Sequence, residues 1–431
     1  MRPTYASFQA LDRQKQIYLR GLSGIRPRVP ADMDQLASRA REHLSEEAYA
    51  YVAGGAGRGL TMRSNREGFD RWQILPRMLR DVSRADTSVK LFGRTLPYPL
   101  LLAPIGVLEM AHREADRAVG RAVAGLGLPF IFSNQASVPM EEVARTMGEG
   151  PRWFQLYWSK RDELVASLVQ RAEACGCEAI VVTLDTTMLG WRIRDLDLAY
   201  LPFLRGKGIA QYTSDPVFQR LMDEPGPEDL TQAKRKLTPQ LLRSVYQLLR
   251  NYPGSFLGNL RSGRPMKAVR TFINIYTNPG LSWDQLAFLR EHTRLPILLK
   301  GILHPDDAQK ALDHGMDGII VSNHGGRQVD GAIGALEALP AIANRVQGNL
   351  PVLMDSGIRS GADVFKALAL GATAVCLGRP YVYGLALDGE AGVRTVLENL
   401  LADFELTMRL SGCTRISAIN SDTIQQNPRH G

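Results

Sequence analysis

The chain has 431 residues, of which 45% are hydrophobic and 22% are charged. These proportions are typical of a folded globular protein, and they exclude a disordered chain, a collagen and a multispan membrane bundle. The 52 Lys and Arg residues against 44 Asp and Glu residues give a net charge of +8. Because the arginines are spread along the chain and form no basic tract, we expect no nucleic-acid partner.

The cysteines and the apolar segments indicate where the protein resides. None of the four cysteines, Cys175, Cys177, Cys376 and Cys413, has the paired spacing of a zinc site or a disulfide scaffold, so we expect no metal and a reducing compartment. The first 30 residues lack the apolar core of a signal peptide, and no later stretch reaches the ~18 uninterrupted apolar residues of a spanning helix. The sequence therefore predicts a cytoplasmic protein.

Residues 1–95 are predicted to form a helical N-terminal extension. Helical patterns lie at residues 31–52 and 61–72. We expect this extension to pack on the rest of the chain, where it would close the bottom of the fold or flank the functional site.

From residue 96 onward, short apolar or β-branched runs alternate with amphipathic stretches bounded by Gly, Pro, Asp or Ser. The predicted strands span residues 100–104, 130–133, 153–157, 179–185, 297–300, 318–322, 352–355 and 374–377. The predicted helices span residues 113–126, 140–147, 161–175, 283–292, 305–314, 334–346, 361–370 and 392–410. Eight such units predict an α/β fold, a (β/α)8 or TIM barrel, over residues 96–431. A doubly wound open sheet stays the alternative because periodicity does not show closure, although no Gly-x-Gly-x-x-Gly follows the first strand.

A long insertion at residues 186–281 separates the fourth strand from the fourth helix and far exceeds an ordinary βα loop. It carries a charged stretch at residues 223–236 and an amphipathic helix near residues 239–249. Because the insertion follows the carboxyl end of a strand, it would hang over the active-site face and could act as a lid. A loop used for contacts between subunits fits the sequence equally well.

Polar residues end seven of the eight predicted strands, where the chemistry of a (β/α)8 barrel takes place. Helix capping would explain a polar residue at the end of one strand, but it does not explain polar residues at the ends of seven strands. The glycines and arginines after the last two strands, Gly357, Arg359 and Arg379, predict a phosphate site. His324 with Asp185 predicts a general base supported by a carboxylate, against the alternative of a structural core histidine.

Two motifs carry a family resemblance: residues 322–330 read SNHGGRQVD, and residues 355–372 read DSGIRSGADVFKALALGA. They closely resemble the FMN-dependent 2-hydroxyacid oxidases and dehydrogenases, and the resemblance extends over nearly the whole chain. It implies FMN as cofactor, a small 2-hydroxy acid and O2 as substrates, and a homotetramer.

The resemblance also implies cofactor contacts. The flavin ring would lie along the backbone of Pro104, Ile105 and Gly106, near N5. Its edge would be bound by Ser133, Gln155 and Thr183 and its N1 side by Lys300, next to Ser322. The ribityl chain and phosphate would be held by Asp355, Gly357, Arg359, Gly378 and Arg379.

For the substrate, the resemblance implies that Arg327 clamps the carboxylate with help from Tyr51 and Arg192. Tyr157 would hydrogen-bond near the reacting hydroxyl group. His324 would accept the hydroxyl proton while Asp185 stabilises the imidazolium, and the cationic Lys300 would stabilise the reduced, anionic flavin.

The branch within the family is indicated by Gly106 and by the long insertion, which together resemble lactate 2-monooxygenase. Such an enzyme would convert L-lactate and O2 into acetate, CO2 and water, and Gly106 would leave an open space beside flavin N5. The alternatives are an oxidase that releases the 2-oxoacid and H2O2, a quinone-linked L-lactate dehydrogenase, and a barrel that binds FMN without catalysis. Gln135 departs from the tryptophan of plant glycolate oxidases. The basic, apolar segment 243–270 keeps membrane contact open as a lesser alternative.

Overall fold

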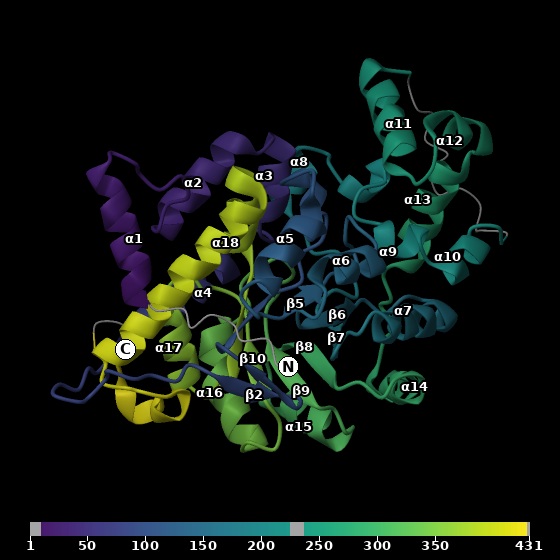
Figure 1. Cartoon of the computed structure of the whole chain (residues 1–431). Helices are drawn as coiled ribbons and strands as arrows, with labels where there is room; N and C mark the ends of the chain where they lie inside the picture. Colours follow the sequence, from purple (N-terminus) through teal and green to yellow (C-terminus); the bar gives the residue numbers. More distant parts are fainter. Residues whose placement is uncertain (1–9, 225–236, 429–431) are drawn as a thin grey trace.

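The computed structural model describes residues 10–224 and 237–428. Its centre is a closed barrel of eight parallel strands in the order β10-β11-β4-β5-β6-β7-β8-β9 (Figure 1). The strands are β4 (Leu100–Leu102), β5 (Phe130–Phe132), β6 (Arg152–Leu156), β7 (Ile180–Thr183), β8 (Ile297–Ile302), β9 (Gly318–Val321), β10 (Val352–Met354) and β11 (Ala374–Leu377). Pairing of Val375 with Leu100 joins the last strand to the first. The predicted (β/α)8 barrel is therefore confirmed, and the open sheet is excluded.

Each strand is followed by a helix that covers the outside of the barrel. These helices are α5 (Ala115–Ala124), α6 (Met140–Met147), α7 (Asp162–Ala174), α14 (Leu286–His292), α15 (Pro305–Asp313), α16 (Ala335–Val346), α17 (Gly361–Ala369) and α18 (Arg379–Leu410). A 3-10 turn, η3 (Trp283–Gln285), precedes α14 and accounts for the start of the predicted helix 283–292. The bounds of the first seven helices lie close to the predicted ones because amphipathic periodicity is a local signal.

The last helix differs from its prediction, which placed it at residues 392–410. It begins at Arg379, and the backbone is non-helical at Asp388 and Gly389, so two helices are joined across a kink. Gly389 has φ 56, in the left-handed region that glycine adopts without strain. The first half of α18 was missed because it directly follows β11, without a loop to mark its start.

Apolar side chains fill the interior of the barrel and form a core separate from the one between strands and helices. The antiparallel hairpin of β2 (Val89–Leu91) and β3 (Arg94–Leu96) adds Leu91 and Leu96 to this interior core. Phe92 at its turn packs on Trp153, with 5.6 Å between ring centroids. This hairpin, and not the predicted N-terminal helices, therefore closes the bottom of the barrel. The predicted domain boundary at residue 95 lies inside β3 and stays a prediction.

The N-terminal segment contains α1 (Ala10–Leu22), α2 (Met33–His43), α3 (Glu46–Ala53) and α4 (Leu60–Asp70). The predicted stretch 31–52 is two helices, because Ser45 caps α3 where α2 has ended, and α1 was not predicted. Strand β1 (Trp72–Ile74) pairs with β12 (Ile424–Gln426) near the C-terminus. The N-terminal segment therefore contacts the rest of the chain in two places. Residues of α3 lie at the face where the barrel strands end, and β1 pairs with β12.

The insertion folds into α8 (Ile193–Asp197), η2 (Pro202–Arg205), α9 (Ala210–Thr213), α10 (Pro216–Leu221), α11 (Pro239–Asn251), α12 (Phe256–Ser262) and α13 (Arg264–Ile275). Buried Phe203, Tyr212 and Phe272 pack ring to ring, with centroids 4.8 to 5.1 Å apart. Figure 1 shows α10 to α13 beside and beyond the barrel, and the predicted helix near 239–249 is α11. Most of the predicted charged stretch 223–236 lies outside the described residues.

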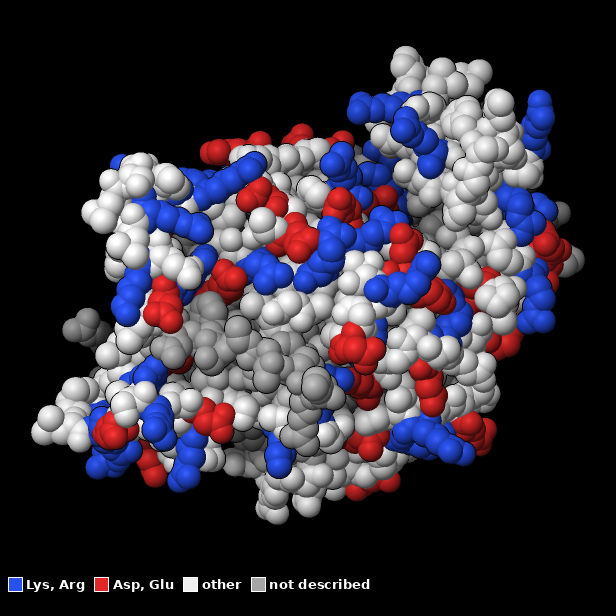
Figure 2. Space-filling view, viewed as in Figure 1, with Lys and Arg blue, Asp and Glu red and all other residues white. Residues whose placement is uncertain are grey.

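The insertion also exposes apolar side chains, including Leu242 and Leu257, next to arginines such as Arg243. In Figure 2 the surface over α11 and α12, at the top right, consists of uncharged residues in white and of Lys and Arg in blue. Elsewhere on the visible face, acidic residues in red lie among the basic ones. In the described part of the chain, no helix has both the length and the apolar composition needed to cross a membrane.

Candidate active site

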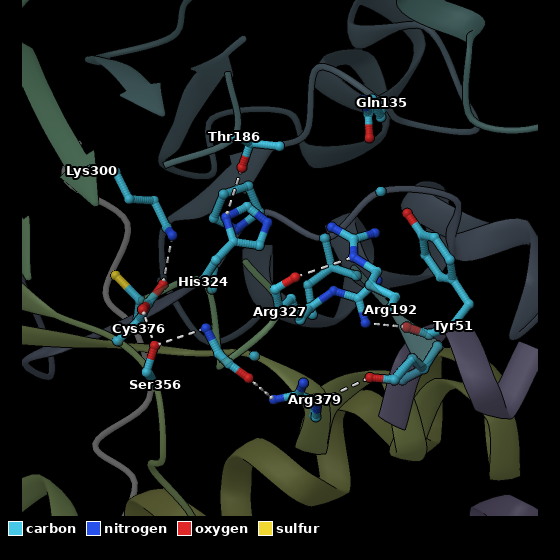
Figure 3. Close-up of a pocket in the computed structure, with 18 of the residues that line it drawn as sticks. Tyr51, Gln135, Thr186, Arg192, Lys300, His324, Arg327, Ser356, Cys376 and Arg379 are labelled. Atoms are coloured by element: carbon cyan, nitrogen blue, oxygen red, sulfur yellow. Dashed lines mark hydrogen bonds and ion pairs between the residues drawn. The ribbon is translucent and has the colours of Figure 1, made fainter. Parts of the chain in front are cut away.

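A cavity that is partly open to solvent lies at the carboxyl ends of the barrel strands. Its walls come from three parts of the chain, as Figure 3 shows: the barrel supplies His324, α3 supplies Tyr51, and the insertion supplies Arg192. Carboxyl ends of parallel strands meet at one edge, so residues distant in sequence converge there.

His324 and Asp185 form a close hydrogen-bonded pair at this wall. His324 Nδ1 lies 2.7 Å from Asp185 Oδ1, and the hydroxyl of Thr186 donates to the same carboxylate oxygen at 3.0 Å. The other ring nitrogen, Nε2, lies 3.5 Å from the hydroxyl of Tyr157. The pair is partly buried, with exposed side-chain fractions of 17% and 14%. Asp185 thus fixes the ring so that Nε2 is the nitrogen available to a ligand.

The charges around this pair set its protonation. Burial lowers the pKa of His324 below its ordinary value, although Asp185 partly opposes the shift. Burial disfavours the charge of Asp185, yet His324 and Lys300 outweigh it and hold the pKa of Asp185 below its ordinary value. At neutral pH the pair is therefore a neutral imidazole next to a carboxylate, as a general base requires.

Lys300 lies in a buried polar network at the ends of β8, β9 and β10. Its ammonium group donates to Ser322 Oγ at 2.8 Å and lies 3.0 Å from Asp355 Oδ2. Burial acts against the charge, but Asp355 and Asp185 raise the pKa of Lys300 above its ordinary value. Lys300 is therefore a fixed positive charge in the floor of the cavity.

Four guanidinium groups, those of the buried Arg192 and the partly buried Arg327, Arg359 and Arg379, line the cavity without an ion pair to any carboxylate of the described residues. Burial, with Arg192 close by, lowers the pKa of Arg327 to about 9, and burial near Arg379 lowers that of Arg359 to about 10. Buried charges are costly without counter-charges, so the arrangement favours the binding of anions.

The segment 324–326 explains how His324 and the arginines come together. Its three residues all have left-handed φ angles of 58, 65 and 74 degrees. A Cβ on Gly325 would lie 2.9 Å from Arg379 Nη1, and one on Gly326 would lie 2.8 Å from the backbone nitrogen of Met62. The two glycines therefore allow both the left-handed turn and the close approach of α4 and Arg379.

Just beneath the cavity lining lie polar atoms that lack a partner among the described residues. Gln155 Oε1 accepts the backbone N–H of Asn134 at 3.0 Å, which leaves Nε2 of Gln155 unpaired. The buried hydroxyl of Thr183 is unpaired too. Buried polar groups are rarely left unsatisfied, so a ligand with hydrogen-bonding edges fits above them. A flavin ring over these strand ends would give Gln155 and Thr183 hydrogen-bond partners, and its phosphate would give Arg359 and Arg379 a counter-charge.

Most predicted site residues line the cavity: Tyr51, Pro104, Ile105, Gly106, Tyr157, Arg192, Lys300, His324, Arg327, Asp355, Gly357, Arg359, Gly378 and Arg379. The others lie just beneath the lining, namely Ser133, Gln155, Thr183, Asp185 and Ser322, and all but Asp185 are buried. The structure thus brings the whole set to one face, whereas the role of each residue is a proposal taken up below.

The sequence did not single out several residues of the wall. Thr186 follows Asp185 and contacts both members of the pair, and Ser356 donates to Asp355 at 2.7 Å. Tyr276 enters from the end of α13. Arg66 in α4 does not line the cavity but supports its wall, because it donates to the carbonyl of Gly357 and pairs with Asp363 at 2.8 Å. The adjacency of Thr186 and Ser356 to predicted residues was a usable signal, but no local pattern marks Tyr276 or Arg66.

The surroundings of Gly106 differ from the expected open space. A Cβ at this position would lie 2.9 Å from both Cβ and the carbonyl oxygen of Gln135 and 3.4 Å from Ser133 Oγ. The glycine therefore allows the loop after β4 to pack closely against the loop after β5. An alanine there would first displace Gln135.

The chain is similar to known flavoproteins in sequence and in structure. Residues 40–426 match the family described as FMN-dependent dehydrogenase. The chain is 40% identical to an L-lactate oxidase of Lysinibacillus sphaericus over 398 residues, which cover 92% of this chain and 93% of that protein. It is also 40% identical to an FMN-dependent alpha-hydroxy acid dehydrogenase of Penicillium citrinum over 414 residues, which cover 96% and 95% of the two chains.

A crystal structure of mandelate oxidase with (S)-4-hydroxymandelic acid has the same fold. It is 35% identical in sequence and superposes with a TM-score of 0.75, covering 92% of this chain and 99% of that chain. The resemblance seen in the motifs at 322–330 and 355–372 is thereby confirmed.

Proposed function

The chain belongs to the family of FMN-dependent dehydrogenases and its cofactor is FMN, and from this premise we propose that it oxidises L-lactate or a similar small L-2-hydroxy acid with O2. The observation that carries the proposal is the neutral His324, held by Asp185, in the same cavity as the unpaired guanidinium group of Arg327. A base and an anion clamp in one cavity suit a substrate with adjacent hydroxyl and carboxylate groups.

We infer that the cofactor is held along the strand ends. The unpaired groups of Gln155 and Thr183, together with Ser133 and the backbone of 104–106, would bind the ring, and Lys300 with Ser322 its pyrimidine side. Asp355, Gly357 and Gly378 would contact the ribityl chain, and Arg359 and Arg379 the phosphate. Arg379 uses three donors on the carbonyls of Val52, Gly54 and Gly325 and a fourth on Sδ of Met62 at 3.9 Å, which leaves one of its five for an anion.

For the substrate, Arg327 would bind the carboxylate. One of its nitrogens is engaged by the carbonyls of Tyr51 and Gly54, and the guanidinium group stacks on the Tyr51 ring at 4.9 Å. These contacts fix the plane of the group, so a carboxylate meets a preformed fork. Arg192, which donates to Gln328 Oε1 at 3.1 Å, would add a second positive charge, and Tyr51 a hydroxyl donor.

The proton of the substrate hydroxyl would pass to Nε2 of His324. The hydroxyl of Tyr157 lies 3.5 Å from this nitrogen and would position the substrate oxygen by a hydrogen bond. Burial raises the pKa of Tyr157 to about 12, so this hydroxyl stays protonated and acts as a donor. Asp185 would stabilise the imidazolium that forms. When bound, FMN supplies the electron acceptor that takes the hydride equivalent from Cα.

For the products, we propose the monooxygenase outcome, in which L-lactate and O2 give acetate, CO2 and water. It requires that pyruvate stays in the cavity until the oxygen chemistry is complete. The walls supplied by the insertion, Leu189, Arg192 and Tyr276, support such retention. The second candidate is an oxidase that releases the 2-oxoacid and H2O2. It is favoured by the L-lactate oxidase relative and by the packing of Gly106 on Gln135, which leaves no open space there.

Anaerobic mixing with L-lactate tests the proposal. The purified protein should show the visible absorption of FMN, and this absorption should bleach with L-lactate and persist with D-lactate. After aeration, acetate without H2O2 would support the monooxygenase, equal amounts of pyruvate and H2O2 the oxidase, and slow reoxidation with rapid transfer to a quinone the dehydrogenase. Bound FMN that no L-2-hydroxy acid bleaches would leave a barrel that binds FMN without this chemistry.

Two further predictions concern the protein as a whole. We infer from the family a homotetramer and from the sequence a cytoplasmic location. Light scattering of the purified protein and fractionation of the source cells would check them.

A further inference from the structure

Gln135 is a wall residue to which the reaction proposed above gives no role. Its backbone is held from three directions: its N–H donates to Ser133 Oγ at 3.1 Å, its carbonyl accepts from Val107 N at 2.9 Å, and Gly106 packs on its Cβ. The next residue, Ala136, accepts from Ala210 N of the insertion at 3.2 Å. The direction in which the side chain leaves the backbone is therefore fixed.

The amide of Gln135 has no hydrogen-bond partner among the described residues, although 91% of the residue is buried, since its exposed fraction is 9%. It lines the cavity, and in Figure 3 its polar end points toward the cavity. Its nitrogen and oxygen are not among the buried unpaired side-chain atoms of the described residues, so they are accessible from the cavity. An amide that faces the cavity without a protein partner is free to bind a ligand group. An amide in this position thus points to a polar group on the ligand.

The charges in the cavity decide which kind of polar group it is. The four unpaired guanidinium groups face about two negative charges of a phosphate and one of a carboxylate, and Asp195 lies close to Arg192 and Arg327. These four negative charges already balance the four positive ones. Lys300 is paired with Asp355, and His324 next to Asp185 is neutral. No positive charge is left for a second carboxylate on the substrate.

We propose that Gln135 is a specificity-determining residue that binds a neutral hydroxyl group on the substrate side chain, so the preferred substrates are L-2-hydroxy acids with a second hydroxyl group. An amide both donates and accepts, which matches a hydroxyl group that does the same. Tyr276, whose ring stacks on Phe272 at 4.7 Å, adds a hydroxyl from the insertion to this part of the wall. The proposal rests on the proposed oxidation of 2-hydroxy acids.

L-Glycerate and L-2-hydroxybutanoate form a matched pair for the test, because they differ by a terminal hydroxyl in place of a methyl group. We expect kcat/KM for flavin reduction to favour L-glycerate by about tenfold or more, since the methyl group leaves the amide unpaired. In Gln135→Met, which has similar volume and no amide, the ratio should fall about tenfold. Gln240→Met on exposed α11 is the control and should keep the wild-type ratio.

Binding of the corresponding products gives a readout that does not depend on turnover. Hydroxypyruvate should bind the oxidised holoenzyme more tightly than 2-oxobutanoate, as measured by titration of the flavin absorption, and Gln135→Met should remove the difference.

Normal bleaching by L-lactate with no preference for L-glycerate or hydroxypyruvate in the wild type would overturn the role of Gln135 and leave the proposed function intact. Since that result needs no variant, a Gln135→Met protein that fails to fold does not remove the test. An unchanged ratio in a folded Gln135→Met would overturn the role as well. Absence of bleaching by every 2-hydroxy acid would overturn the proposed function, whereas a preference for hydroxypyruvate would still support the binding role.

Discussion

Two parts of the same cavity wall differ in how their polar groups are satisfied. At the ends of β7, β8 and β9, Asp185, Lys300 and His324 are bound to one another or to neighbouring side chains, with only Oδ2 of Asp185 lacking a partner among these groups. On the side formed by the β5 loop and the insertion, the amide of Gln135 and the hydroxyl of Tyr276 have no hydrogen-bond partner among the described residues. Groups that the protein itself fixes are ready for a reaction, whereas groups left open are available to select a ligand.

The largest effect should come from the paired part. In His324→Gln the amide cannot accept a proton as imidazole does, so the rate of flavin reduction by L-lactate should fall by ~10²–10⁴. FMN should stay bound, because the cofactor contacts proposed above do not use the imidazole. Stopped-flow absorbance under anaerobic conditions measures the rate, and near-normal reduction would contradict the assignment of the base.

Asp185→Asn should lower the rate of reduction next most strongly, because the imidazolium formed in the reaction loses its counter-charge. It should also shift the pH dependence. Burial already holds the pKa of His324 below its usual 6.5, and Asp185 is the group that opposes this shift. Without the carboxylate the pKa falls further, so the acid limb of kcat/KM, below pH 6.5 in the wild type, should move to lower pH. A limb that moves to higher pH would reverse the interpretation.

Arg327→Lys should weaken binding of the substrate carboxylate. A lysine replaces the bidentate fork with a point charge and loses the stacking on Tyr51, so KM for L-lactate should rise by about 10–100-fold. The dissociation constant of oxalate, from flavin absorption, should rise in parallel. An unchanged KM together with an unchanged oxalate constant would place the carboxylate elsewhere in the cavity.

Gly106→Ala tests the open part of the wall. The new methyl group would lie 2.9 Å from Gln135, so overpacking should cost about 1–3 kcal/mol of stability and displace that side chain. We expect slower reoxidation by O2, more H2O2 per turnover and a modest effect on reduction, because Arg327 still anchors the substrate. Thermal unfolding and the two half-reactions are the measurements. Unchanged reoxidation and product yields would show that position 106 does not influence the reaction with O2.

The smallest effect should be protection of the insertion by a ligand. Arg243, Arg250 and Arg261 are exposed on α11 and α12, and we expect trypsin to cut there first. Because Arg192 and Tyr276 connect the insertion to the cavity, oxalate should slow these cuts a few-fold, as expected for a lid. Peptide mapping with sulfate at equal ionic strength is the control. Equal cleavage rates would favour a role in subunit contacts.

The sequence predicted the barrel and its chemistry well because both depend on local signals. Every strand of the barrel was placed within two residues of its observed bounds, since strands buried on both sides are short apolar runs with turn residues around them. The residues that follow those strands had to converge once the barrel closed. The start of α18 and the helix α1 were missed because neither is set off by a clear boundary or a buried stripe.

By itself the sequence determined the eight βα units, the motif with His324 and Arg327, and the family. The tertiary structure decided which distant segments meet: the hairpin β2–β3 at the bottom of the barrel, Arg66 against the carbonyl of Gly357, and Gln135 packed on Gly106 with its amide unpaired. Periodicity and motifs report the neighbours of a residue along the chain. Contacts between distant segments, and the polar groups left without a partner, exist only after the barrel has closed and the insertion has packed on it.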